Sequence, residues 1–200
     1  MWEERFATSE DYVYGTAPTG FLIAHSSYLL PGQKALSIAD GEGRNSVYLA
    51  EQGLDVTALE FAPSALARAK ALAQARNVFV DYRACDIQTD SWQETNIYDL
   101  VLAVFVQFTG PEGRTRQFDG MKVSCKPGGL VMIHGYTPKQ LELGTGGPPS
   151  EQNMYTEAQM RADFAGWDIL ECTSYEREVQ EGAGHSGMSA LLDFVACKPT

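Results

Sequence analysis

The stretch ALSIADGEGRN, residues 35–45, decides the fold of this 200-residue chain. An apolar run enters a turn that carries Gly41 and Gly43, and a helix-like pattern follows directly and stops at Gly53. A second apolar run then ends on an acid, Glu60. A strand, a glycine turn, a helix and a second strand in this order form a βαβ unit, which binds nucleoside-containing ligands at its strand ends. The glycines let a ligand approach the backbone without a Cβ in the way, and Glu60 can accept hydrogen bonds from ribose hydroxyls.

The rest of the chain continues this alternation of strands and helices. Further strands are expected at 78–82, 97–106 and 130–134, and helices at 19–30, 63–76, 114–125 and 156–164. Two last strands, 167–178 and 188–197, are joined by a segment too short for a helix, so they should pair antiparallel. The pattern predicts an α/β fold with a doubly wound, mostly parallel seven-stranded sheet and an antiparallel C-terminal strand.

Length and composition predict one domain that spans residues 1–200. Within it, the aromatic-rich segment 1–30 is expected to form an N-terminal lid or extra helix. Residues 137–152, rich in glycine and proline, are expected to form a loop insertion near the site, because loops this long inside a compact domain are usually functional.

The net charge of -11 narrows the class of partner. It opposes binding to nucleic acid and to an anionic membrane surface, so a small-molecule substrate is expected. No apolar run approaches the length of a membrane span, and the start MWEER lacks the features of a secretion signal. The four cysteines are far apart, which predicts reduced thiols in a cytoplasmic protein with no metal site. The oligomeric state is not readable from the sequence.

Three acids stand at or near the ends of successive apolar runs: Asp40, Glu60 and Asp86. In a doubly wound sheet, such strand ends lie side by side along one crevice. Glu60 is expected to hold a ribose, and Asp86 to accept from an adenine amino group beside the backbone of Ile87. The alternative reading makes Asp86 a turn or helix-capping residue.

With these features, the chain resembles the class I S-adenosylmethionine-dependent methyltransferases over nearly its whole length. The shared features are the order of elements, the glycine turn, Glu60, the triplet CDI at 85–87 and the turn KPGG at 126–129. The resemblance is closest to small tellurite-resistance or thiopurine-type enzymes. It is carried there by WEERF at 2–6, YVYGTAP at 12–18, GEGRN at 41–45, GGP at 146–148 and EGAGH at 181–185.

The resemblance implies in-line methyl transfer from S-adenosylmethionine to a small molecule, possibly a thiol or chalcogen oxyanion, with S-adenosylhomocysteine as product. It places the glycine turn at the methionine part of the cofactor, Phe61 beside adenine and the end of the fourth strand near the carboxyl or sulfonium end. The implied cofactor-binding residues are Ala39, Asp40, Gly41, Gly43, Asn45, Glu60, Phe61, Asp86, Ile87, Ala103, Val104 and Phe105.

Two residues depart from the family pattern. The family usually has an acid where Ser37 stands and a glycine where Ala39 stands. Ala39 is expected to be harmless if its φ is negative. Ser37 is expected either to weaken cofactor binding or to leave the task to Asp40.

The catalytic residues are not identified by the sequence, and the candidates are Tyr14, His134 and His185. Each has a structural alternative, since His185 near the tip of the last hairpin can equally be a surface group. A thiolate or reduced chalcogen oxyanion needs no base, whereas a hydroxyl or amine acceptor does.

Two other functions compete with methyl transfer. The first is a non-catalytic nucleoside-binding or regulatory module with the same fold, which the departures at Ser37 and Ala39 motivate. The second is a dinucleotide-dependent oxidoreductase, because the spacing of Gly41, Gly43 and Ser46 nearly matches that fingerprint. The chain leaves no length for the substrate domain that such an oxidoreductase needs.

Overall fold

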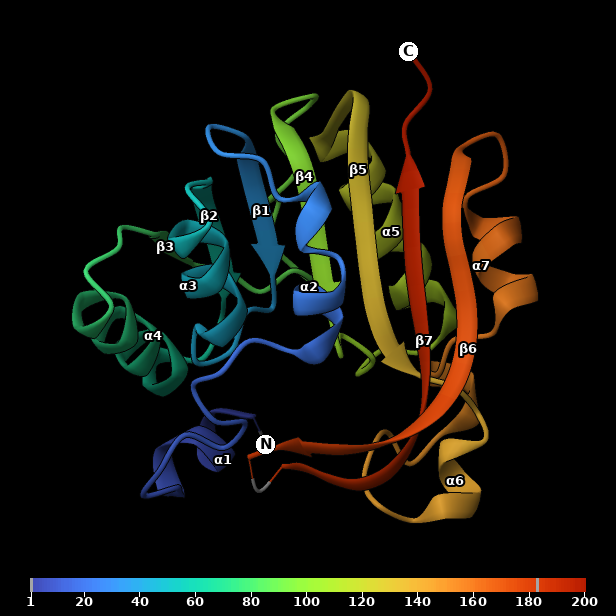
Figure 1. The fold of residues 1–200 in the computed structure, drawn as a ribbon. Helices are drawn as coiled ribbons and strands as arrows, with labels where there is room; N and C mark the ends of the chain where they lie inside the picture. Colours follow the sequence, from blue (N-terminus) through green and yellow to red (C-terminus); the bar gives the residue numbers. More distant parts are fainter. Residues whose placement is uncertain (1, 183) are drawn as a thin grey trace. The chain divides into compact units, whose positions relative to one another are not determined.

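The computed structural model describes residues 2–182 and 184–200 (Figure 1). Its strands form one seven-stranded sheet in the order β3-β2-β1-β4-β5-β7-β6. The strands are β1 (Lys34–Ile38), β2 (Asp55–Glu60), β3 (Asp81–Ala84), β4 (Tyr98–Val104), β5 (Cys125–Tyr136), β6 (Asp168–Glu181) and β7 (His185–Cys197). The pairs β1–β2, β2–β3 and β4–β5 are parallel, and β5–β7 is antiparallel. The predicted fold class is confirmed.

The helices follow the predicted alternation with the strands. They are α1 (Trp2–Thr8), α2 (Gly20–Ala24), α3 (Arg44–Glu51), α4 (Pro63–Ala75), α5 (Pro111–Ser124), α6 (Gln140–Leu143) and α7 (Glu157–Asp163), with short 3-10 turns at Ser26–Tyr28 and Glu151–Asn153. The chain divides into two compact units, Met1–Ser91 with Glu181–Gly184, and Trp92–Gln180 with His185–Thr200. The expectation of a single domain stays a prediction.

The first unit holds the βαβ unit that the sequence predicts. β1 and β2 pair in parallel from Lys34 opposite Asp55 to Ile38 opposite Leu59, and their inner residues are buried, as expected for a strand covered on both faces. α3 begins at Arg44, after Gly43 with φ 89°. No side chain caps this helix end.

Two expected boundaries in the first unit are wrong. The third strand spans Asp81–Ala84 rather than 78–82, because Asn77 adopts φ 56° and the amide of Val78 still bonds the carbonyl of Ala73 at the end of α4. Phe79 is consequently 80% exposed in a loop. The helix expected at 19–30 is a short α2 followed by a 3-10 turn, because the backbone at His25 leaves helical geometry.

The second unit is built on buried strands. β4 is apolar and buried along most of its length, as a strand covered on both faces should be. The KPGG motif lies inside β5 rather than before it, and the pairing of β4 with β5 is irregular between Tyr98 and Leu100. Gly128 supplies φ 75° at this irregularity. Figure 1 shows β6 and β7 curving together toward their connecting turn.

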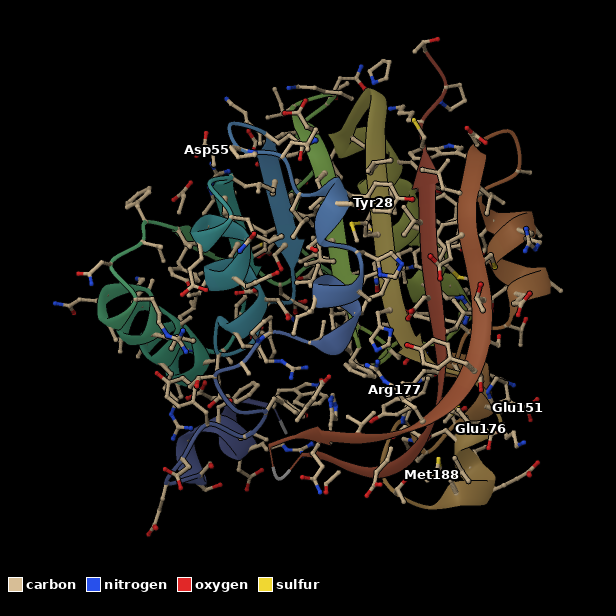
Figure 2. The ribbon with its side chains drawn as sticks, viewed as in Figure 1. Tyr28, Asp55, Glu151, Glu176, Arg177 and Met188 are labelled. Atoms are coloured by element: carbon tan, nitrogen blue, oxygen red, sulfur yellow. The ribbon has the colours of Figure 1, made fainter. Side chains whose placement is uncertain are left out.

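The segment 137–152 contains α6 and is tied to the last two strands of the second unit. Figure 2 labels Glu176 on β6 and Met188 on β7. Lys139 Nζ lies 2.5 Å from Glu176 Oε1, and Thr145 Oγ1 donates to the carbonyl of Met188. The segment is thus an ordered insertion with a helical turn, and its predicted place near the site stays a prediction. Among the described residues, no helix is both long and apolar enough to cross a membrane.

Candidate functional site

The glycine turn between β1 and α3 is built from left-handed backbone. Ala39, Gly41 and Gly43 have φ 46°, 66° and 89°. The condition under which Ala39 was expected to be harmless, a negative φ, is therefore not met. An L-residue with a Cβ in this region is strained by about 1–2 kcal/mol, and such strain persists where the surrounding structure imposes it. The chain thus has left-handed backbone at Ala39, the position at which the family it resembles usually has a glycine.

Asp40 is held by serine hydroxyls on both of its carboxylate oxygens. Ser37 Oγ lies 2.7 Å from Oδ1, and Ser46 Oγ lies 2.5 Å from Oδ2. Burial raises the pKa of Asp40, although the hydrogen bonds from the two serines lower it. The hydroxyl of Ser46 thus orients the Asp40 carboxylate. Ser37 contacts the same carboxylate, which we expect to take the role of the acid that the family usually has at position 37.

Glu60 closes the turn from the end of β2. Its Oε2 accepts from the amide of Gly41 at 2.9 Å, and its Oε1 accepts from the amide of Ala62 at 2.9 Å. Burial raises the pKa of Glu60, the two amides lower it, and the charge of Asp40 raises it further. Each carboxylate oxygen can accept a second hydrogen bond, so the geometry fits a pair of ribose hydroxyls.

Asp86 lies just beyond the end of β3, next to the strand that ends at Glu60. The amide of Cys85 bonds the carbonyl of Glu60 at 3.0 Å, which sets the end of β3 beside the end of β2. Asp86 Oδ1 accepts from the amide of Gln88 at 2.9 Å, the turn geometry that the alternative reading expects. Ile87 is buried, whereas the ring of Phe61 is 46% exposed. An exposed aromatic ring directly after Glu60, the expected ribose ligand, could stack on the face of an adenine.

Asn45 and Gly43 serve the packing of the turn. Asn45 Oδ1 accepts from the amide of Thr19 at 3.0 Å. A Cβ on Gly43 would lie 2.8 Å from Ala69 and 2.9 Å from the hydroxyl of Tyr82, so this glycine allows α3 to approach α4. Their assignment to the cofactor stays a prediction.

The N-terminal segment covers the glycine turn within the first unit. A Cβ on Gly41 would lie 3.8 Å from Cζ of Phe6 in α1. Buried Glu42 accepts from the amide of Val13 at 2.7 Å and pairs with Arg68 Nη1 at 2.7 Å. Arg68 also donates to the carbonyls of residues 9 and 11. The first part of the segment 1–30 thus packs over the glycine turn, and its role as a lid stays a prediction.

Tyr14 lies between two arginines in the first unit. The guanidinium carbons of Arg5 and Arg44 lie 5.2 Å and 5.9 Å from its ring centroid. Burial raises the pKa of the Tyr14 phenol above its ordinary value of 10.0, although both arginines lower it. Tyr14 therefore stays protonated at neutral pH and can donate a proton but not remove one.

The second unit groups the other two catalytic candidates around one strained residue. Phe105, at the end of β4, has φ 56°. Its ring centroid lies 4.8 Å from His134, 4.8 Å from Tyr136 and 4.1 Å from His185. His185 is buried at the start of β7 rather than at an exposed tip. Ala183, in the motif EGAGH, lies outside the described residues.

His134 is one member of a buried polar group. It is 1% exposed, and its Nδ1 lies 2.6 Å from Asp193 Oδ1. The hydroxyl of Tyr175 donates to the same carboxylate at 3.1 Å. His134 and Asp193 face each other across β5 and β7, so the register of the two strands sets the pair.

Residues 35–129 match the family model of a methyltransferase domain. Residues 35–129 of this chain therefore carry the sequence pattern of a methyltransferase domain. The match spans the glycine turn, Glu60, Asp86 and the end of β4, whereas Tyr14, His134 and His185 lie outside it. The class takes its methyl group from S-adenosylmethionine, which agrees with the predicted cofactor.

Solved structures with the same fold cover nearly the whole chain. TehB from Haemophilus influenzae has a TM-score of 0.74 and 21% identity, over 98% of this chain and 67% of that chain. A protein solved in work on the conversion of a disulfide bond into a thioacetal group during echinomycin biosynthesis has a TM-score of 0.76 and 17% identity, over 97% of this chain and 86% of that chain. These likenesses show the fold of the methyltransferase domain.

Curated relatives are longer than this chain. The uncharacterized protein Rv1405c of Mycobacterium tuberculosis is 25% identical over 121 residues, which are 60% of this chain and 43% of that protein. The methyltransferase domain described here therefore spans less than half the length of that relative.

Several residues of the methyltransferase domain were not singled out by sequence reasoning. The pairing of Glu42 with Arg68 joins α4 to the N-terminal segment, and that of Arg44 with Glu181, at 2.8 Å, joins the start of α3 to the end of β6. A single sequence carries no signal that Arg44 and Glu181, which are far apart along the chain, form an ion pair. Ser46 could have been found, since it lies three residues after Gly43, at the start of the expected helix, where a serine can also serve as a helix cap.

Proposed function

We propose that this chain is an S-adenosylmethionine-dependent methyltransferase that acts on a small molecule. The observation that carries the proposal is the contact between the amide of Gly41 and Glu60 Oε2 at 2.9 Å. It joins the glycine turn to the acid at the next strand end and leaves acceptor positions for ribose hydroxyls. The bound cofactor supplies a methyl group on a sulfonium.

In this proposal, different residues of the first unit bind different parts of S-adenosylmethionine. Glu60 would hold the ribose, Phe61 and Asp86 would flank and face the adenine, and Asp40 would accept from the ammonium of the amino-acid end. The serine pair on Asp40 supports this last role, because it fixes a carboxylate at the position next to Ser37. A cationic tail also suits a chain with net charge -11.

Neither Tyr14 nor His134 is well placed to remove a proton from a methyl acceptor, which favours an acceptor that is already deprotonated. Tyr14 stays protonated, and His134 is buried and bound to Asp193. A thiolate or chalcogen oxyanion needs positioning rather than proton removal. We therefore propose a thiol or chalcogen oxyanion as the acceptor. The four free cysteines support a reducing, cytoplasmic setting.

The proposal is tested by release of S-adenosylhomocysteine in a panel of thiols, selenite, tellurite, halides and small hydroxy acids. We expect turnover with at least one thiol or chalcogen oxyanion and none with the hydroxy acids. A parallel titration with S-adenosylmethionine, S-adenosylhomocysteine and NAD separates the alternatives. Cofactor binding without turnover on any acceptor favours the non-catalytic module, and binding of NAD alone favours the oxidoreductase.

A further inference from the structure

The short strand β3 forms one outer edge of the sheet. It stands first in the strand order, with β2 as its neighbour. The amide of Cys85, directly after β3, donates to the carbonyl of Glu60 in β2 at 3.0 Å. Backbone groups alternate in direction along a strand. Ala84 and Tyr82, one and three residues before Cys85, therefore direct their amides and carbonyls away from β2.

The other edge of the sheet, at β6, is covered by side chains of α7. The amide of Ser174 donates to Glu157 Oε1 at 2.8 Å, and the carbonyl of Cys172 accepts from Arg161 Nη2 at 3.2 Å. An uncovered row of backbone groups can pair with another chain, and proteins usually cover or blunt it. At β3, no helix, loop or side chain in the part of the chain that the structure describes bonds the outward backbone groups.

The side chains of β3 carry both signs of charge on one face of the strand. Asp81 and Arg83 share this face, because residues two apart in a strand point the same way. Asp81 Oδ2 lies 2.8 Å from Arg83 Nε, and the two side chains are 45% and 46% exposed. Phe79, two residues before the strand, is 80% exposed. Aromatic rings are enriched where proteins meet, so the edge combines an apolar group with an acid and a base.

One register of two antiparallel β3 strands suits both the backbone and the charges. Hydrogen-bonded pairs form between residues whose backbone groups point outward, so a two-fold axis between two copies passes at Tyr82 or at Ala84. The axis at Tyr82 sets Asp81 opposite Arg83 of the second copy, and Arg83 opposite its Asp81. The axis at Ala84 sets Arg83 opposite Cys85 and forms no charge pair. Charge complementarity therefore selects Tyr82.

We infer that β3 is the interface of a symmetric dimer, in which it pairs antiparallel about Tyr82 with β3 of a second copy of this chain. The same patch serves both copies, as a two-fold axis requires. The net charge of -11 repels two copies in general, so their association needs a local pairing of opposite charges. Because β3 has only four residues, we expect a dimer that depends on protein concentration. The inference goes beyond the proposed function and needs neither cofactor nor acceptor.

Charge reversal tests the dimer and its register. Sedimentation equilibrium at about 0.15 M salt, which screens the general repulsion, should show the wild type in a monomer–dimer equilibrium. Asp81→Arg and Arg83→Asp each set like charges opposite one another, so each should raise the dissociation constant of the dimer about ten-fold or more. The double variant Asp81→Arg/Arg83→Asp sets opposite charges face to face again and should restore the dimer. Lys139→Glu, which reverses one charge of the exposed pair with Glu176, is the matched control and should leave the dimer unchanged.

A measurement on the wild type alone covers the case in which thermal unfolding shows a reversed variant to be unstable. Hydrogen exchange of single amides is followed by nuclear magnetic resonance at increasing protein concentration. The Tyr82 amide, which points away from β2, should become more protected as the dimer forms. The inference is overturned by a wild type that stays monomeric up to about 1 mM, or by a Tyr82 amide whose exchange does not change with concentration. A dimer that neither single reversal weakens, or that the double variant does not restore, overturns it equally.

Discussion

At the scale of single residues, the departures from the family pattern have different physical consequences. Ala39 keeps the left-handed backbone that glycine normally supplies, with φ 46°. Ser37 does not leave a gap, because it donates to Asp40. The sequence identifies both positions, but the sign of φ and the direction of a serine hydroxyl depend on contacts that a single sequence does not display.

We predict that Ala39→Gly raises the free energy of unfolding by about 1 kcal/mol, because it removes the strain of a Cβ in the left-handed region. Chemical denaturation measures the change. Ala50→Gly in α3 is the control, and there the same substitution should lower stability by about 1 kcal/mol. Equal effects at the two positions would show that Ala39 is not strained.

We predict that the affinity for S-adenosylhomocysteine falls as the pH drops from 7 toward 5. Burial raises the pKa of Glu60 above its ordinary value of 4.5, so this carboxylate takes up a proton at a higher pH than a solvated one. Protonation removes acceptor capacity toward ribose hydroxyls. Calorimetric titration across this range measures it. Glu60→Gln should bind more weakly and with a shallower pH profile; some slope remains because burial also raises the pKa of Asp40. A slope as steep as that of the wild type would show that Glu60 does not contribute to the pH dependence.

At the scale of elements, the ends of helices and strands are predicted correctly where a glycine, a proline or a capping residue lies next to them in the sequence. β2 ends at Glu60, as the end of the second apolar run predicts, because a glycine precedes the strand and a proline follows it closely. α7 begins after Thr156 as expected, and the hydroxyl of this cap accepts from the amide of Gln159. β3 is displaced because the apolar residues 78–80 signal a strand, while the left-handed turn at Asn77 keeps them outside the sheet.

We predict that Gly43→Ala lowers the free energy of unfolding by more than about 2 kcal/mol. A Cβ there would lie 2.8 Å from Ala69, closer than packed atoms tolerate, and φ is 89°. Gly32→Ala is the matched control, since Gly32 has φ 83° with no atom within 4 Å of the added Cβ. A common loss of about 1 kcal/mol in both variants would mean that only backbone strain matters at Gly43.

At the scale of the whole molecule, the family was readable from the sequence and the contacts between distant segments were not. The order of elements, the glycine turn and Glu60 were sufficient for the class, and the family match at 35–129 agrees. A lid or extra helix was expected at 1–30 from its aromatic residues; α1 is a helix there, and the role as a lid stays a prediction. The attachment of this segment was not predicted, because the pair formed by Glu42 and Arg68 is visible only once α4 is placed.

We predict that Arg68→Ala loosens residues 9–15 and lowers the free energy of unfolding by about 2 kcal/mol, because buried Glu42 loses its charged partner. Hydrogen–deuterium exchange of the 9–15 amides measures the loosening. Arg76→Ala, which breaks the more exposed pair with Glu51, should leave exchange at 9–15 unchanged. Unchanged exchange in Arg68→Ala would contradict the role of this pair in holding the lid.

The central claim is that the glycine turn and Glu60 together hold the nucleoside of S-adenosylmethionine. The most direct measurement is a calorimetric titration of wild type and Glu60→Ala with S-adenosylhomocysteine. We expect the wild type to bind and Glu60→Ala to bind at least several-fold more weakly, since two ribose hydroxyls lose their acceptor. Equal affinities in the two proteins would remove Glu60 from the site and contradict the claim.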